Sequence, residues 1–425
     1  MLVLEAKIYS KQTQYNAMDE AIRTAQFIRN KALRYWMDNK GVGKYQLSAY
    51  CKVLAAEFPF AHKLNSMARQ SSADRAWAAI SRFYKNCKSK IPGKKGFPKF
   101  KKHSRSVEYK TTGWKLSENR RKITFTDKNN IGQVRLKGTL DLNWYDIKQI
   151  KRVRILRRAD GYYCQFLVDA ENTQKIEPSS SQIGLDVGLN HFYTDDKGNE
   201  IENPRFYRRG EKALNRLNRS KSKKYRKAAK PQSKNYHKAR KRYAIKHLKI
   251  SRQRKDHAVK LSHCVGRVPR LEASGVARCV ITSNDVVAYE DLRIANMVKN
   301  HNLAKSITDA GWYQFRVWLE YFGYKFGKIT VAVPPQYTSV NCSNCGAKVT
   351  KTLSTRTHHC KCGCILGRDE NAARNILSLG LSESLAVDGF PGISKVTNPK
   401  GTVGHTGSKA WGDETAIVAD ENLSE

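Results

Sequence analysis

Residues 341–376 read NCSNCGAKVTKTLSTRTHHCKCGCILGRDENAARNI. Cys342 and Cys345 form one closely spaced pair of thiols, and Cys360 and Cys362 form a second pair after fourteen intervening residues. Two such pairs, each on a tight turn, can close a tetrahedron around one zinc ion. The sequence therefore predicts a small zinc-stapled module with these four cysteines as its ligands.

The composition of the chain indicates a polyanionic partner. The 425 residues are 40% hydrophobic, which supports a globular fold, but they carry a formal net charge of +42. Nucleic acid is favoured over a membrane surface, because a membrane-surface protein would concentrate its charge on one amphipathic helix. Many of the 20 Tyr, 14 Phe and 7 Trp residues are interleaved with Lys and Arg, which provides stacking surfaces beside phosphate contacts.

The distribution of cysteines and of apolar segments indicates in which cellular compartment the protein works. Five of the ten cysteines fall within Cys342–Cys364 and the others are scattered, which is not typical of a disulfide framework. The first residues, MLVLEAKIYSKQ, do not have the pattern of a signal peptide, and no apolar run approaches the length of a membrane span. We therefore expect a cytoplasmic protein with reduced thiols.

Periodicity divides the chain into modules. It predicts a β-barrel in residues 1–10 and 91–177, interrupted by a helical insert in residues 11–90. After a linker at 178–182, an α/β domain is expected in residues 183–334 and 366–381, with the zinc module, residues 335–365, inserted in it. Residues 382–425 are rich in Gly, Ser and Thr and predict a disordered tail.

One segment of the α/β domain is strongly basic. Residues 201–260 carry 23 Lys and Arg against 3 Asp and Glu, with few apolar anchors. This pattern predicts a hairpin of helices that lies along phosphates and contributes little to a core.

Three acidic residues are candidates for chemistry. Asp186 lies in an apolar strand-like segment, Glu290 ends the apolar run VVAYE, and Asp369 stands at the start of an Ala-rich helix. A carboxylate in a buried strand is costly unless it has a hydrogen-bond partner or a cation, so each acid alone could be structural. Three converging carboxylates could instead hold two Mg²⁺ or Mn²⁺ ions about 3.5–4 Å apart for phosphodiester cleavage.

Four ordered motifs carry a resemblance to a known family. GLDVGLNHFYTDDKG (184–198), VVAYEDL (286–292), PPQYTSVNCSNCG (334–346) and RDENAARNI (368–376) resemble the TnpB (OrfB) proteins of bacterial insertion sequences, relatives of the compact type V CRISPR effectors. The resemblance covers roughly residues 1–380. It implies a RuvC-type nuclease domain of RNase H-like fold with an inserted zinc ribbon, preceded by a wedge-like β-barrel with a helical recognition insert.

The resemblance also implies a site and a function. Asp186, Glu290 and Asp369 match the catalytic acids that bind Mg²⁺ or Mn²⁺, and Cys342, Cys345, Cys360 and Cys362 match the ligands of a structural zinc ion. The implied activity is RNA-guided cleavage of double-stranded DNA beside a short flanking motif, by a monomer bound to a guide RNA from the element's end. Such an endonuclease assists maintenance of the transposon in the bacterial cytoplasm.

Two alternative functions stay open. A transposase that performs strand transfer itself through a tyrosine needs a His-hydrophobe-His pair, which the sequence does not show. A zinc-ribbon regulator that binds DNA or RNA without catalysis would leave the three acids without a purpose.

Three features depart from the family pattern. Gly367 stands where many relatives have an acid, so Asp369 must carry the role, and Cys364 is a fifth thiol that could replace Cys362. The stretch His263–Ala277 contains helix-breaking residues where a helix should lead directly to the strand of Glu290. The sequence leaves open whether this stretch is a tolerated loop or impairs the nuclease domain.

Overall fold

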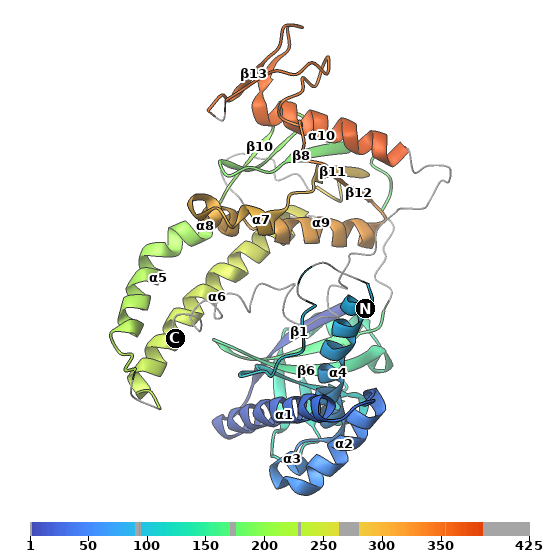
Figure 1. Ribbon diagram of the computed structural model, residues 1–425, viewed down its shortest axis with the longest axis vertical. Helices are drawn as coiled ribbons and strands as arrows, with labels where there is room; N and C mark the ends of the chain where they lie inside the picture. The colour runs from blue at the N-terminus through green and yellow to red at the C-terminus, as the bar shows by residue number, and fades with distance from the viewer. Residues whose placement is uncertain are drawn as a thin grey trace. The chain divides into compact units, whose positions relative to one another are not determined.

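The chain divides into two compact units, Met1–Glu171 and Asn172–Glu425. The structure is a computed structural model, drawn in Figure 1, and it describes residues 2–89, 93, 95–170, 176–227, 231–262, 280–352 and 354–385. The stretch His263–Ala277 and the expected tail from residue 386 onward lie outside the described residues.

The first unit is built on a seven-stranded antiparallel sheet in the order β2-β6-β7-β1-β5-β4-β3. Its strands are β1 (Leu2–Tyr9), β2 (Ser106–Lys110), β3 (Trp114–Leu116), β4 (Lys122–Phe125), β5 (Gly132–Lys137), β6 (Ile150–Arg158) and β7 (Gly161–Val168). Three short 3-10 helices connect them: η1 (Thr111–Gly113), η2 (Leu140–Trp144) and η3 (Ile147–Gln149).

The expected closed barrel is wrong for this unit, because the sheet is open. β2 and β3 form its two edges, and no ladder joins them within the described residues. η1 links the two edge strands, and α4, the last helix of the insert, packs against β2 and η1. Asn65 at the start of α4 donates its side-chain amide to Thr126 (2.7 Å) and its backbone N–H to Asp127 (2.6 Å). The insert thus packs against β2, one of the two edge strands that would have to pair to close the sheet into a barrel.

The insert itself consists of four helices: α1 (Gln12–Asp38), α2 (Lys44–Glu57), α3 (Pro59–Lys63) and α4 (Ser66–Lys88). Their apolar stripes are buried, for example Met18, Ile28 and Leu33 on α1 and Ile80 on α4. These side chains share one continuous core with the inner residues of the sheet.

The second unit contains a five-stranded mixed sheet in the order β10-β9-β8-β11-β12. β8, β11 and β12 are parallel, whereas β9 and β10 are antiparallel to their neighbours. The strands are β8 (Gln182–Asp186), β9 (His191–Asp195), β10 (Glu200–Glu202), β11 (Val286–Glu290) and β12 (Ile329–Val333), and a separate hairpin pairs β13 (Thr357–His359) with β14 (Ile365–Gly367).

Helices cover both faces of this sheet. The helices of the second unit are α5 (Phe206–Ser222), α6 (Lys234–Ser262), α7 (Ile294–Met297), α8 (His301–Ala310), α9 (Trp312–Phe326) and α10 (Arg368–Leu385). α9 buries Phe315 and Leu319 in the core on one face, and α10 packs Ile376 on the other. α10 also includes residues 382–385, which the sequence assigned to the tail. No helix among the described residues is long and apolar enough to cross a bilayer.

Candidate active site and thiolate cluster

Two of the predicted acids end neighbouring strands. Asp186 is the last residue of β8 and Glu290 is the last residue of β11, and these strands run parallel with Leu185 paired to Tyr289. Both carboxylates therefore lie at the same edge of the sheet. Leu185 and Tyr289 enter the core that α9 covers, so strand alternation directs Asp186 and Glu290 to the opposite face, where α10 lies.

The third acid is carried on α10, which packs unusually close to the sheet. A Cβ atom at Gly184 would clash with the carbonyl oxygen of Ala373 and would lie 2.8 Å from the Cβ of Leu377. A Cβ atom at Gly380 would lie 2.5 Å from the Cβ of Ala288 on β11. Glycine at these two positions lets α10 lie directly on β8 and β11, with Asp369 in its first turn.

The three acids form one electrostatic cluster. Burial raises the pKa of Asp186 well above its usual range, and the charges of Glu290 and Asp369 raise it further, while Arg368 opposes this shift. Burial also raises the pKa of Glu290, against a hydrogen bond from Thr338 that lowers it. A carboxylate whose pKa is raised by burial and by neighbouring acids, as that of Asp186 is, is stabilised in the ionised form by a bound cation.

The carboxylates are less tightly gathered than the thiols. Among the described residues, the carboxylate oxygens of the three acids do not all lie within 4.8 Å of one another. Two groups that contain cysteines, described below, do have all their ligand atoms within this distance. Their hard oxygen atoms suit Mg²⁺ or Mn²⁺, and a spread wider than one ion's ligand shell is compatible with two ions about 3.5–4 Å apart.

The four predicted thiols come together as a cluster. The Sγ atoms of Cys342, Cys345, Cys360 and Cys362 all lie within 4.8 Å of one another. The distance is 3.7 Å between Cys342 and Cys362 and 3.6 Å between Cys345 and Cys360. Sulfurs at about 2.3 Å from a tetrahedral zinc ion are separated by about 3.8 Å. The thiolate cluster, as we name these four residues, therefore fits zinc.

The fifth thiol, Cys364, belongs to a different group. It lies within 4.8 Å of Cys342 and of the buried His358, which makes a group of three ligands. A structural zinc site takes four ligands, so the set that contains Cys362 is the better fit.

The sequence analysis did not predict three polar residues that contact Glu290 or the loop beside it. The Thr338 hydroxyl donates to Glu290 Oε1 at 2.6 Å, and Asn371 and Asn375 of α10 bind the backbone of the loop that contains Thr338. A signal was present: two Asn residues four positions apart lie on one face of a helix whose neighbouring residues include Ala372, Ala373 and Ile376.

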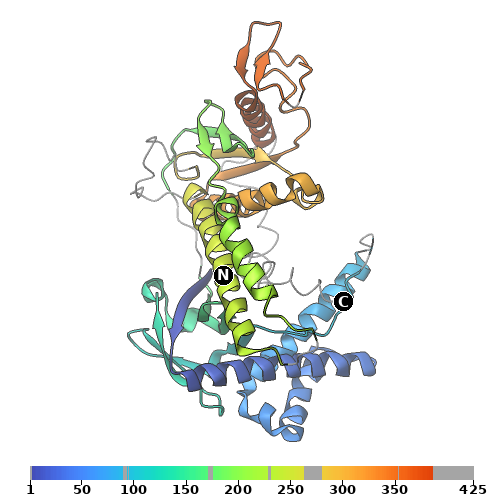
Figure 2. The same cartoon turned by 90° about the vertical axis from the view of Figure 1, so that its left-hand side faces the viewer.

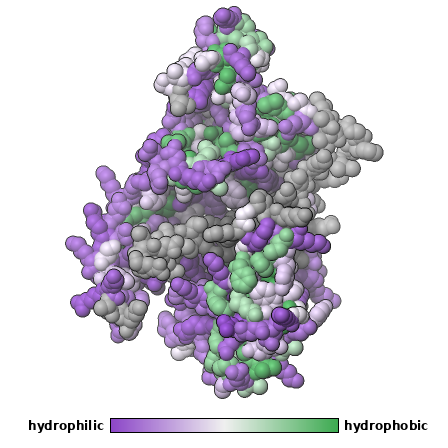
Figure 3. Space-filling model, viewed as in Figure 1, coloured by the Kyte–Doolittle hydropathy of each residue, from purple (hydrophilic) through white to green (hydrophobic). Residues whose placement is uncertain are grey.

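The predicted basic hairpin is formed by α5 and α6, which we call the arm. The two helices run side by side away from the sheet in Figure 1 and Figure 2, and most of the surface visible at this place in Figure 3 is hydrophilic. Asp309 holds the base of the arm, since its carboxylate accepts the backbone N–H groups of Tyr207 (2.7 Å) and Arg208 (3.1 Å). Lys221 is an exception to the exposed charges: it is buried, with its ammonium over the Tyr243 ring.

Two family models match parts of the second unit and the end of the first. Residues 165–269, which include Asp186, match the OrfB family, described as a probable transposase. Residues 312–376, which include the thiolate cluster and Asp369, match the Cas12f1-like TNB domain.

Curated relatives cover most of the chain. A protein of Streptomyces pristinaespiralis named "Putative RNA-guided DNA endonuclease" is 28% identical over 405 residues, 90% of each chain. The Escherichia coli protein InsQ, which carries the same description, is 28% identical over 319 residues, 71% of this chain and 72% of its own.

A solved structure is similar at low identity. A chain of the Cas12f1–sgRNA–target DNA complex is 15% identical and has a TM-score of 0.49, with 86% of this chain and 83% of that chain covered. Three of the four motifs lie within the two family matches, and relatives named as RNA-guided DNA endonucleases extend over most of the length, so the chain is similar to the TnpB (OrfB) proteins.

Proposed function

We propose that this chain is an RNA-guided DNA endonuclease that hydrolyses phosphodiester bonds of double-stranded DNA. The observation that carries the proposal is the placement of Asp186 and Glu290 at the ends of two neighbouring parallel strands, with Asp369 in the first turn of the helix that packs on these strands. We assign this sheet to the RNase H-like fold of RuvC type. Its central strand β8 carries the first acid, the neighbouring strand β11 carries the second, and the last helix carries the third.

The proposed division of labour separates two metals. Asp186, Glu290 and Asp369 would hold Mg²⁺ or Mn²⁺, and such ions supply an activated water and stabilise the leaving oxygen. Thr338 orients the Glu290 carboxylate, and the helix position of Asp369 fixes the third acid. Cys342, Cys345, Cys360 and Cys362 would hold a structural zinc ion that contributes to folding of the segment between β12 and α10.

The proposed partners are a guide RNA and double-stranded target DNA. The names of the curated relatives and the net charge of +42 support this proposal. The arm contributes exposed cations such as Lys223, Lys227 and Lys241, which suit backbone phosphates. Binding through phosphates predicts that affinity falls with salt at a slope of about −0.7 to −0.9 per contact, whatever the base sequence.

The test begins with the RNA that co-purifies with the full chain. This RNA is sequenced, and DNA that matches it is offered with a library of flanking sequences in the presence of Mg²⁺. We expect cleavage of matching DNA beside one flanking motif, and none of unmatched DNA. Binding without cleavage would support the non-catalytic regulator, and joined DNA products would support a transposase that performs strand transfer.

Elemental analysis tests the thiolate cluster separately. Freshly reduced protein should contain one zinc per chain, and the Cys362→Ser variant should lose it. The matched variant is Cys364→Ser, which should keep the zinc. Loss of zinc from the Cys364 variant with retention in the Cys362 variant would show that Cys364 is the fourth ligand.

A further inference from the structure

The loop between β12 and the thiolate cluster carries a buried hydroxyl that binds the second acid. Thr338 is 4% exposed, and its Oγ1 lies 2.6 Å from Glu290 Oε1 and 3.4 Å from the carbonyl oxygen of Pro335. A hydroxyl has one proton to donate, so the short bond to the carboxylate takes it. Among the described residues, no other hydrogen-bond donor to the Glu290 carboxylate is found. This bond engages Oε1 and leaves Oε2 available to a cation.

The same loop is fastened to α10 by two asparagines. Asn375 uses its side-chain amide to donate to the carbonyl oxygens of Thr338 and Asn341, both at 2.8 Å. Asn371, which is fully buried, donates to the Asn341 carbonyl at 2.8 Å and accepts the backbone N–H of Ser343 at 2.9 Å. These bonds hold the loop on both sides of Asn341, immediately before Cys342.

The backbone of this loop needs such support. Tyr337 has φ of 64°, in the left-handed region that non-glycine residues rarely occupy. Its carbonyl oxygen accepts the N–H groups of Val340 (3.0 Å) and Asn341 (2.9 Å), which closes a tight turn around Thr338. A non-glycine residue in this region is strained and persists where the surrounding structure determines it. The asparagines of α10 supply that constraint.

We propose that Thr338 is a positioning residue for DNA cleavage, held in place by Asn371 and Asn375 of α10. This inference rests on the proposed nuclease function. Asp369 lies two residues before Asn371 on the same helix. α10 therefore places the third acid directly and orients the second acid through the loop. The chain of contacts also ties the start of the thiolate cluster to the acids.

The test compares Thr338→Val with Thr338→Ser. Valine keeps the volume and removes the hydroxyl, whereas serine keeps the hydroxyl. Loss of a residue that orients a metal ligand typically costs about 10- to 100-fold in activity or metal affinity. We expect Thr338→Val to slow cleavage by about that factor and to raise the Mn²⁺ concentration needed for half-maximal cleavage. Thr338→Ser should keep the wild-type cleavage rate and the wild-type Mn²⁺ requirement. Affinity for RNA and DNA should stay unchanged in each variant.

A second readout does not depend on activity. Thermal unfolding of the protein without nucleic acid is followed as Mn²⁺ is added. Mn²⁺ should stabilise the wild type and the Thr338→Ser variant more than the Thr338→Val variant, with zinc content unchanged in all three. Thr352→Val, at an exposed threonine beyond the loop, is the matched control and should behave as wild type.

The role of the asparagine is tested by combining variants. Asn375→Ala should shift the Mn²⁺ dependence in the same direction as Thr338→Val. If Asn375 acts through Thr338, the double variant should be no worse than Thr338→Val alone. Additive losses would overturn the coupling. If Thr338→Val folds poorly, Asn375→Ala alone still tests the loop, and an unchanged Mn²⁺ dependence in that variant would overturn the proposal.

The inference and the proposed function can fail separately. Wild-type cleavage and Mn²⁺ dependence in Thr338→Val, with Glu290→Ala inactive, would overturn the role of Thr338 and leave the nuclease intact. Cleavage by Glu290→Ala would instead overturn the assignment of that acid and, with it, the proposal.

Discussion

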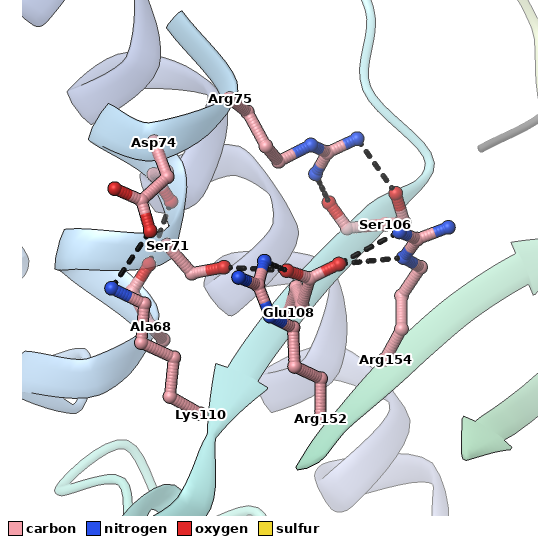
Figure 4. Close-up of polar contacts among 10 residues, drawn as sticks. Ala68, Ser71, Asp74, Arg75, Ser106, Glu108, Lys110, Arg152 and Arg154 are labelled. Atoms are coloured by element: carbon pink, nitrogen blue, oxygen red, sulfur yellow. Dashed lines mark hydrogen bonds and ion pairs between the residues drawn. The ribbon is translucent and has the colours of Figure 1, made fainter. Parts of the chain in front are cut away.

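Glu108 of the first unit and Asp186 of the second unit are both acids in strands, but their surroundings are opposite. Figure 4 shows Glu108 between α4 and the sheet, where it accepts from Arg152 (2.9 Å), Arg154 (2.7 Å) and the Ser71 hydroxyl (2.9 Å). Burial alone would raise the pKa of Glu108, but the two arginines and Ser71 lower it to about 2. Asp186 is surrounded by two further acids, and its pKa is raised.

This difference separates a structural acid from a candidate catalytic one. The charge of Glu108 is compensated by Arg152 and Arg154, so its contacts join the helical insert to β6 and stabilise the first unit. The charge of Asp186 is opposed by Arg368 but faces two other acids in a buried place, so its ionised form costs stability unless a cation is bound. Perturbed groups of the second kind cluster at functional sites. The contrast predicts opposite consequences when either acid is replaced.

The largest expected effect is on cleavage. Asp186→Ala, Glu290→Ala and Asp369→Ala should each reduce the rate of DNA cleavage by about 10³-fold or more, which corresponds to about 4 kcal/mol of transition-state stabilisation. Affinity for nucleic acid should stay close to wild type, because none of the three acids lies on the arm. Single-turnover cleavage and filter binding measure the two quantities. Near wild-type cutting by any one variant would remove that residue from the site.

The next effect is on stability of the first unit. Glu108→Gln removes the charge that both arginines face, and breaking a buried ion pair typically costs about 3–5 kcal/mol. Because Arg152 and Arg154 are partly exposed, with side chains 39% and 23% exposed, we expect about 3 kcal/mol by denaturant unfolding. Asp38→Asn, which breaks the exposed pair with Arg34, is the control and should cost less than about 0.5 kcal/mol. Equal losses in both variants would contradict the structural role of Glu108.

The pH dependence of the first unit follows from the same residue. The pKa of Glu108 is about 2 in the folded state against 4.5 for an unperturbed glutamate, so the folded state binds fewer protons between these values. Its contribution to stability is therefore fully present above about pH 5 and is lost as the pH falls toward 2. Unfolding measured across this range should show a steeper loss for wild type than for Glu108→Gln. Parallel curves would mean that Glu108 does not carry this dependence.

The sequence could identify the candidate ligands of the second unit but not the partners of Glu108. Cys342 and Cys345 lie in one short motif, and Asp369 lies in another. In each motif the residue types and their spacing indicate the chemistry. Glu108 has its partners 37, 44 and 46 residues away, on α4 and β6, so only tertiary packing brings them together. The open sheet was missed for a related reason. Strand periodicity does not reveal whether two edges pair, and here α4 packs against one of them.

The smallest expected effect has the opposite sign and tests the comparison most directly. The folded pKa of Asp186 is raised, so its ionised form opposes folding above the pH at which the unfolded residue loses its proton. Asp186→Asn keeps the shape and removes the charge, and should stabilise the protein by about 1 kcal/mol in EDTA. Added Mn²⁺ should stabilise the wild type and so reduce the difference in unfolding free energy between Asp186→Asn and the wild type. Glu108→Gln, which changes an acid to its amide in the same way, should destabilise under both conditions. A loss of stability in Asp186→Asn without metal would show that Asp186 has a compensating partner, and the distinction between the two acids would then fail.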